Sequence, residues 1–508
     1  MKIHTIFRIL TLLVMTHLPF RGATQSLNKA QILEAAQAYF RPGIATLHAF
    51  LQIPNDGHFP EQIDQNVNWC LAAFKERQFD VQVLATAGAP LVFAEKVYHP
   101  GAKSLLFYLQ IDGQPVDSSK WFQESPFQPA LKRLNEQGEW EIMDWSAIEK
   151  DFDPDWRIFA RSASDSKGPA VAFMTALDII REKGIIPAYN IKVIMDFQEE
   201  LGSPDLPAAV VKYRDLLDAE MLLIMDGTRH VSNLPTLTFG ARGIATVTIK
   251  VFGARGDLHS GQYGNFAPNP VFKLSKLIAG MKDDEGRVII PGFYDGIHLS
   301  DKEKRMLNDI PEDVAEIKQT LGIAEADQVG ATYQEALQYP SLNIRGLRAA
   351  WVGKEVRTLI PAEAIAEIDM RLVPESDGQR LVDLIKQYVV DQGYHLVNGE
   401  PTDEERSQYA KLASLTYRLG SKPFRTDLDS PIGEWLSSAM TRTFGDRFVK
   451  MRTTGGSQPM APFISTLDIP AVSVRIPNPD NSIHAPNENL RLGNFLEGIQ
   501  MCLGVLTE

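Results

Sequence analysis

The sequence predicts an α/β protein in which a mostly parallel sheet has helices on both faces and is interrupted by an inserted α+β domain. Short apolar runs at 105–109, 191–197, 221–225 and 471–474 are typical of buried strands. Amphipathic stretches such as 170–183 and 207–217 separate them, and this alternation favours a sheet covered on both faces. From about residue 237 the pattern changes to alternating apolar and polar residues, which indicates a sheet with one solvated face.

The alternating pattern defines the inserted domain. It covers 237–253 and 362–373, with helical patterns at 270–281 and 378–391, and the α/β pattern resumes near Asp429. We therefore predict a larger domain of residues 26–237 and 426–508, interrupted by a smaller domain of residues 238–425. Residues 118–156, rich in tryptophan and charge, are interpreted as an insertion that either caps the mouth of a site or decorates the surface.

The first 25 residues are predicted to be a signal peptide. Lys2 and Arg8 precede an apolar run from Ile9 to Met15, and a stretch of small residues follows at 22–26. The alternative is an uncleaved anchor, but a membrane-spanning helix needs about 20 apolar residues. We expect export to the periplasm or the medium.

Composition excludes several classes of protein. The 508 residues carry a formal net charge of -13, which argues against nucleic acid as a partner. Two cysteines, Cys70 and Cys502, cannot form a disulfide framework, and we expect two buried free thiols. Beyond the N-terminus no apolar segment is long enough to be embedded in a membrane.

Polar side chains follow the predicted strands where each one ends. Gln110 and Asp112 follow the first strand, Glu199 and Glu200 the second, and Asp226 the third, while Asp165 precedes a predicted helix. Ligands of open α/β sheets bind at the carboxyl ends of strands. A single acid there is often a helix cap or turn residue. Several acids at one edge would repel one another unless a cation neutralised them.

His484, in the sequence Ser482 to Glu488, has the chemistry to join such a site. Zinc binds imidazole and carboxylate ligands, and catalytic zinc sites leave one position open. A lone histidine is more often structural, but the neighbouring acids favour a ligand. The candidate metal ligands are Asp165, Glu200, Asp226 and His484.

At these residues the chain resembles the co-catalytic dizinc exopeptidases and amidohydrolases. This family includes carnosinase, the cytosolic nonspecific dipeptidase, carboxypeptidase G, aminoacylase and succinyl-diaminopimelate desuccinylase. The dipeptidase branch fits best, and the similarity covers nearly all of the mature chain. Six motifs carry it, at 164–169, 239–243, 257–261, 357–361, 371–374 and 455–457.

The resemblance implies a role for each matching position. It implies a zinc-exopeptidase-like catalytic domain and a lid, residues 238–425, that forms a homodimer. Asp165 would bridge two divalent ions, expected to be zinc, with Glu200 and His484 completing one site and Asp226 serving the other. Glu199 would be the general base, Asp112 would orient a ligand or tune that base, and His259 would reach across the dimer to stabilise the oxyanion. The substrate carboxylate would be held by Arg371, Ser457, Thr358 and Gly456.

The main departure from the family pattern is Gln110, where the family has a histidine ligand. A glutamine oxygen is a doubtful ligand for zinc and suits Mn, Ca or Mg better. Three outcomes are open: Gln110 binds a metal of altered preference, the second site is weakly filled, or the protein is inactive.

The resulting hypothesis is metal-dependent hydrolysis of a peptide or N-acyl bond next to a free carboxylate, in dipeptides or short peptides. A metal-bound water would attack, with Glu199 as base. The alternatives are a catalytically silent homologue that binds peptide or metal, and an N-acyl amino acid hydrolase or desuccinylase.

Overall fold

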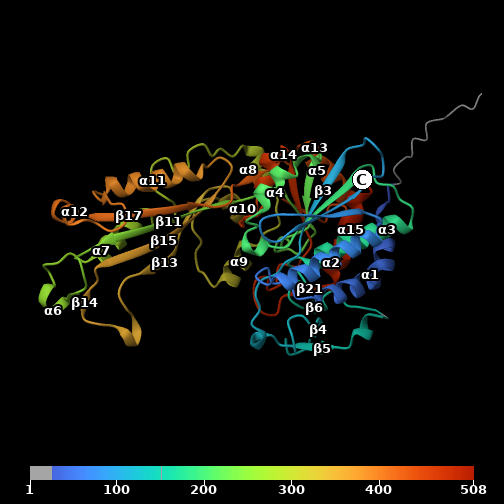
Figure 1. Cartoon of the computed structure of the whole chain (residues 1–508), viewed down its shortest axis with the longest axis horizontal. Helices are drawn as coiled ribbons and strands as arrows, with labels where there is room; N and C mark the ends of the chain where they lie inside the picture. Colours follow the sequence, from blue (N-terminus) through green and yellow to red (C-terminus); the bar gives the residue numbers. More distant parts are fainter. Residues whose placement is uncertain (1–25, 150) are drawn as a thin grey trace, which may run out of the picture.

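A twisted eight-stranded sheet forms the centre of the larger part of the molecule (Figure 1), with strand order β1-β2-β7-β3-β8-β20-β9-β19. The computed structural model describes residues 26–149 and 151–508, so the predicted signal peptide lies outside the described residues. The four central strands β7, β3, β8 and β20 are mutually parallel, as predicted. The bounds are β1 Asp80–Leu84, β2 Leu91–Lys96, β3 Ser104–Gln110, β7 Asn190–Asp196, β8 Met221–Ile224, β9 Thr236–Thr238, β19 Val449–Met451 and β20 Ala471–Arg475.

Helices cover both faces of this sheet. Successive residues of its strands point to opposite sides, and apolar side chains on each side pack against a layer of helices. Leu105 and Phe107 belong to one core, and Leu106 and Tyr108 belong to another. The predicted helix at 207–217 is broken into two, because Tyr213 leaves the helical conformation. The first face carries α1 Lys29–Leu51, α2 Pro60–Glu76, α3 Lys167–Glu182, α13 Pro431–Phe444 and α15 Leu492–Leu506, and the second carries α4 Leu206–Lys212, α5 Arg214–Leu217 and α14 Ala461–Leu467.

A second sheet, of five strands in the order β13-β15-β11-β17-β16, lies at the other end of the molecule (Figure 1). Buried and half-buried residues alternate along β11 and β15, so one face is packed and the other is accessible. Helices α7 and α11 pack on the buried face. The bounds are β11 Gly243–Phe252, β13 Ser341–Arg348, β15 Glu363–Leu372, β16 His395–Leu396, β17 Leu412–Leu419, α7 Pro270–Ala279 and α11 Gly378–Asp391. Together the two sheets confirm the predicted fold class, and we call the smaller part the lid.

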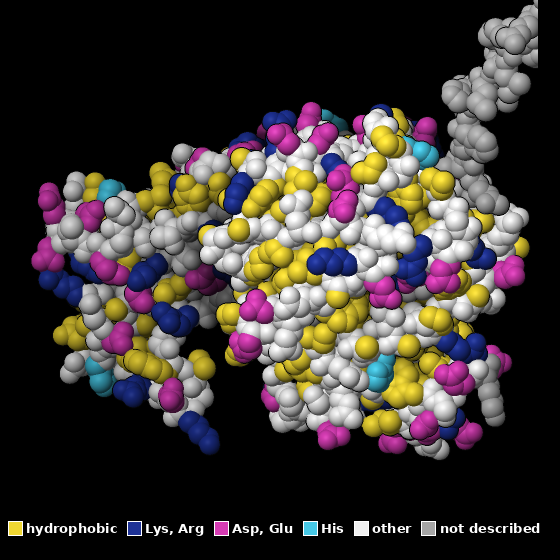
Figure 2. Space-filling model, turned by 45° about the vertical axis from the view of Figure 1, so that its right-hand side comes forward, with side chains coloured by type: hydrophobic (Ala, Val, Ile, Leu, Met, Phe, Trp, Pro, Cys, Tyr) yellow, Lys and Arg dark blue, Asp and Glu magenta, His cyan; other side chains and the backbone are white. Residues whose placement is uncertain are grey.

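The chain passes between the two sheets along a short antiparallel ribbon. Strand β9 belongs to the large sheet, and the next strand, β10 Gly240–Ala241, pairs with β18 Phe424–Arg425. Figure 2 shows the lid projecting from the larger body, with a hollow between their lower parts.

Part of residues 301–340, which the sequence analysis assigned to the lid, packs against the larger body. Their helices are α8 Asp301–Asn308, α9 Val314–Leu321 and α10 Tyr333–Ala336. Arg452, which follows β19, donates hydrogen bonds to Glu303 and to Gln338, and Ile310 packs with two residues of β19. This segment therefore forms part of the junction between the two sheets.

The predicted insertion at 118–156 contributes to a small four-stranded sheet, β21-β6-β4-β5, on the flank of the body. The strands are β4 Ala130–Leu134, β5 Trp140–Met143, β6 Arg157–Phe159 and β21 Asn489–Arg491. At the far tip of the lid, β12 Leu258–His259 pairs with β14 Leu359–Ile360, followed by α6 Ser260–Tyr263. The helix α12 Asp403–Gln408 lies beside the lid sheet.

Cys70 and Cys502 are both buried and unbridged, which confirms that prediction. In the part of the chain that the structure describes, no helix is both long enough and apolar enough to cross a membrane.

Candidate metal centre

The carboxyl ends of the parallel strands bring the predicted acids to one edge of the large sheet. Strand β7 leads into Glu199 and Glu200, β3 leads into Asp112, and β8 leads into Asp226. Asp165 enters the same edge from the loop before α3.

Asp165, Glu200 and His484 form a group that fits a metal ion. Their ligand atoms lie within 4.8 Å of one another, with His484 Nε2 3.0 Å from Asp165 Oδ2 and 3.3 Å from Glu200 Oε2. Burial and the charge of Asp165 raise the pKa of Glu200 to about 8, and the hydrogen bond with Asp165 raises the pKa of His484 to about 9. Two close carboxylates that share one imidazole are a donor set suited to a divalent cation.

A fully buried carboxylate, Glu488, holds the loop that carries Asp165. It accepts hydrogen bonds from the backbone N–H groups of Ser162, Ser164 and Asp165 at 2.8–3.0 Å and from Arg161 Nη1 at 2.6 Å. Its side chain is 0% exposed and that of Arg161 is 3% exposed. Glu488 follows His484 in the same loop, so one loop supplies a ligand and also positions a second one.

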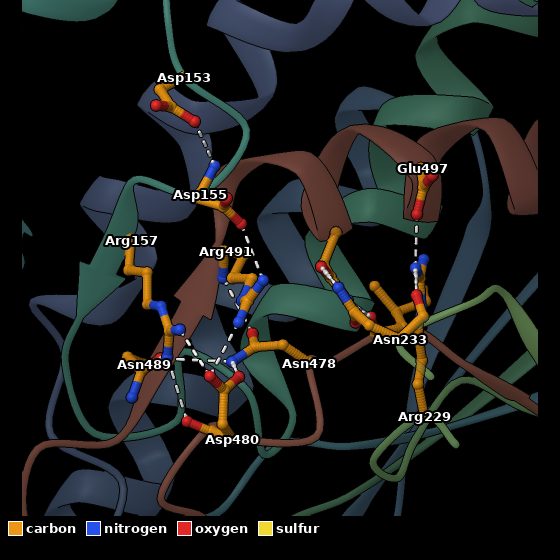
Figure 3. A network of polar contacts seen from close by, with 12 residues as sticks. Asp153, Asp155, Arg157, Arg229, Asn233, Asn478, Asp480, Asn489, Arg491 and Glu497 are labelled. Atoms are coloured by element: carbon orange, nitrogen blue, oxygen red, sulfur yellow. Dashed lines mark hydrogen bonds and ion pairs between the residues drawn. The ribbon is translucent and has the colours of Figure 1, made fainter. Parts of the chain in front are cut away.

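Polar contacts fix both ends of the His484 loop (Figure 3). Asp480 accepts hydrogen bonds from Arg157 and Arg491 at 2.6 and 2.8 Å, and Asn478 contacts Asp480 and Asn489. Within the loop, His484 has a left-handed φ of 58°, a conformation that is uncommon for residues other than glycine.

Glu199 lies beside this metal-binding group in the same cavity. Asp112 accepts hydrogen bonds from the backbone N–H groups of Glu199 and Glu200, both at 3.0 Å, and so fixes the turn that presents the two glutamates. Burial, followed by the charges of Asp226 and Asp165, raises the pKa of Glu199 well above its ordinary value. A carboxylate destabilised in this way is a stronger base.

The second half-site fits a metal ion poorly. Ser166 Oγ lies 2.5 Å from Asp226 Oδ1 and 2.9 Å from Asp165 Oδ1, so a hydroxyl bridges the two carboxylates. Burial and the charge of Asp165 raise the pKa of Asp226 to about 6. Gln110 is buried, and neither atom of its amide has a hydrogen-bond partner among the residues described. Besides Asp165 and Asp226, the donor available to a metal ion in this half-site is therefore the neutral amide of Gln110.

The cavity next to these groups has a volume of about 370 Å³ and is also lined by Gly456, Ser457 and Arg475. Arg371, on lid strand β15, donates a hydrogen bond from Nη1 to Ser457 Oγ at 3.2 Å. Arg371 of the lid and Ser457 of the larger body, both predicted to bind the substrate carboxylate, therefore lie side by side. None of the described residues of 118–156 lines this cavity. That segment instead supports the His484 loop, because the backbone N–H of Phe122 donates to Asn487 Oδ1 at 2.9 Å.

His259 and Thr358 are not brought to the site within one chain. Both are exposed at the tip of the lid, where the backbone N–H of Ser260 donates to the carbonyl of Thr358. Neither lines the cavity that holds Glu199 and His484.

Several residues of the site received no role from the sequence analysis. Gln114 Nε2 donates to Glu200 at 2.7 Å, Ser166 bridges two acids, and Glu488 with Arg161 supports Asp165. Arg475 ends strand β20 at the same sheet edge, and the rule that located the acids at strand ends would also have located it.

Comparison with known proteins gives a consistent picture. A sequence profile described as "Peptidase family M20/M25/M40" matches residues 106–508. The Cys-Gly metallodipeptidase of Schizosaccharomyces pombe is 26% identical over 422 residues, which cover 81% of each chain. The Beta-Ala-His dipeptidase of Homo sapiens is 24% identical, covering 81% of this chain and 76% of that protein.

Solved structures share the fold over nearly their whole length. An M20 family metallo-carboxypeptidase from Sulfolobus solfataricus superposes with a TM-score of 0.73 and 28% identity, covering 92% of this chain and 98% of that one. Human carnosine dipeptidase 1 gives a TM-score of 0.71 and 21% identity, covering 94% and 98%.

Proposed function

Because the chain belongs to peptidase family M20/M25/M40, we propose that it is a metallopeptidase that hydrolyses dipeptides and short peptides next to a free carboxylate. The observation that carries this proposal is the cavity in which Glu199 adjoins the Asp165, Glu200 and His484 group. Relatives that act on Cys-Gly and on β-Ala-His suggest these two dipeptides as first substrates.

Each group of the site has a distinct task in this reaction. Asp165, Glu200 and His484 would hold a divalent ion, for which their oxygen and nitrogen donors favour zinc, and the ion supplies Lewis acidity. A carboxylate oxygen of Glu199 takes a proton from the attacking water and delivers it to the leaving amine nitrogen. Asp112 keeps Glu199 in place through the backbone of the turn.

The free carboxylate of the substrate would bind at Arg371 and Ser457, with Gly456 leaving room beside them. A guanidinium matches a carboxylate in charge and geometry. The Ser457 hydroxyl accepts a hydrogen bond from Arg371, and a bound carboxylate would replace that contact.

The lid would form a homodimer that brings His259 and Thr358 of one chain to the cavity of the other. Two features support this proposal. Both residues lie at the lid tip, and large apolar side chains are exposed on the lid, with Phe266 at 86%, Phe272 at 71% and Val352 at 85%. Exposed apolar side chains that gather into one patch are typical of an interaction surface. A Phe272→Asp variant should run as a monomer in sedimentation, while an unchanged dimer mass would contradict this surface.

Export is proposed from residues 1–25 alone, and N-terminal sequencing of the mature protein would test it.

The activity is tested with purified protein, a divalent metal and a panel of dipeptides and N-acyl amino acids. We expect dipeptide hydrolysis that a chelator abolishes and added metal restores. A Glu199→Gln variant should lose activity by about 10²- to 10⁴-fold and keep its metal, because only the base is removed. Turnover of N-acyl amino acids alone would identify an acyl hydrolase instead, and an absence of all turnover would indicate a silent binding protein.

A further inference from the structure

Three polar side chains stand in a row at the metal-binding edge of the sheet. Ile224 of β8 pairs with Tyr108 of β3 on one side and with Ser473 of β20 on the other. β8 ends at Ile224, and its register continued by two residues brings Gln110, Asp226 and Arg475 to the same level, where the two-residue repeat of an extended chain gives them the same face. Asp226 thus has an uncharged amide on one flank and a guanidinium on the other.

Arg475 is buried, with 6% of its surface exposed, and lines the same cavity as Asp165, Glu199 and His484. Its Nε donates to Thr238 Oγ1 at 2.8 Å, whereas its buried Nη2 has no hydrogen-bond partner in the described part of the chain. A Cβ atom added to Gly227 would lie 1.9 Å from Nη1, so the guanidinium packs directly against the residue that follows Asp226.

Arg475 supplies a positive charge to this site without a second metal ion. Asp165, Glu199, Glu200 and Asp226 provide the negative charge, and one divalent ion neutralises only part of it. The guanidinium of Arg475 is a permanent cation, and its charge opposes the effect of burial on Asp226. A second ion between Asp165 and Asp226 would lie near this guanidinium and would have neutral Gln110 as its remaining ligand.

We propose that Arg475 takes the place of a second metal ion, so that this peptidase works with one divalent ion held by Asp165, Glu200 and His484. The proposal rests on the proposed metal-dependent function for the first ion. It accounts for the lack of a histidine at position 110, because a site occupied by a fixed cation does not require a metal ligand stronger than glutamine.

Metal stoichiometry tests the proposal independently of turnover. The wild type and variants are loaded with excess Mn²⁺, passed through gel filtration and measured by elemental mass spectrometry. The electron paramagnetic resonance spectrum then distinguishes an isolated Mn²⁺ from a coupled pair. We expect one equivalent and an isolated ion in the wild type and in Gln110→His, and two equivalents with a coupled spectrum in Gln110→His/Arg475→Met.

Each alternative outcome is decisive. Two equivalents in the wild type would overturn the proposal. Two in Gln110→His alone would show that the arginine does not exclude the ion, and one in the double variant would show that it does not occupy the ion's place. Gln110→His/Arg475→Lys keeps the cation and should bind one equivalent, which controls for altered packing, and circular dichroism checks that each variant is folded. A wild type that binds one ion and hydrolyses no peptide would refute the proposed function and leave the stoichiometry intact.

Discussion

Replacing Glu488 by glutamine should weaken both the fold and the metal centre. The carboxylate accepts four hydrogen bonds, two on each oxygen, from Arg161 and three backbone N–H groups. Glutamine keeps one oxygen and places an NH₂ group against donors, and it leaves the buried guanidinium of Arg161 without its counter-charge. Removing one partner of a buried ion pair costs about 3–5 kcal/mol.

The effect on metal binding follows from the contact with Asp165. Glu488 holds the backbone N–H of this ligand at 2.9 Å. Loss of an outer partner of a metal ligand weakens metal affinity by about 10- to 100-fold. Urea denaturation of the apo protein measures the first effect, and competition with a chromophoric chelator measures the second.

A second buried arginine provides the matched control. Glu497 of α15 pairs with Arg229, whose side chain is 0% exposed, and Figure 3 shows this pair apart from the Asp480 network. Glu497→Gln should lower stability by less than Glu488→Gln does, because Glu497 is 31% exposed. It should leave metal affinity unchanged. If Glu488→Gln loses stability but binds metal as tightly as the wild type, the positioning role assigned to Glu488 is wrong.

Two further predictions concern the substrate and the loop. Arg371→Met should raise KM for dipeptides by about 10- to 100-fold with a small change in kcat, because a charged hydrogen bond is worth about 1.5–3 kcal/mol in ground and transition state alike; steady-state kinetics would refute this if kcat fell instead. Burial would raise the pKa of Asp480, but hydrogen bonds from Arg491, Asn478 and Arg157 lower it below its ordinary value. The stability that Asp480 contributes is therefore present above the ordinary carboxyl pKa of about 3.9 and is lost as pH falls through the lower folded value. Thermal midpoints of the wild type and Asp480→Asn should differ at pH 7, and the difference should shrink progressively as the pH falls below about 4; a difference that is constant at every pH would contradict this.

Much of the fold was predictable because its signals are local. The four central strands begin and end within two residues of the predicted runs, since continuous apolar stretches mark strands buried on both faces. The acids at their ends were found by the same reasoning. The packing of Glu303, Ile310 and Gln338 against the body was not predictable, because it depends on contacts such as that of Glu303 with Arg452, which are far apart in sequence.

Two residues of the site illustrate where sequence reasoning stopped. Glu488 lies in the same short motif as His484, but its role depends on burial among backbone N–H groups, and burial of a charge is not visible in a sequence. The departure at Gln110 was visible at once. Its explanation needed the register of β3, β8 and β20, which places Arg475 on the opposite side of Asp226.

The order of elements along the chain has a consequence for folding. Strand β20 lies between β8 and β9, and α15 packs against α3, yet β20 and α15 come after the whole lid. The large sheet therefore stays incomplete until this late segment docks, and contacts so distant in sequence form slowly. His484 belongs to the same segment, so a chain still being synthesised already has Asp165 and Glu200 but lacks the imidazole. Tight binding of the ion is therefore expected only once the two segments of the interrupted domain have docked against each other.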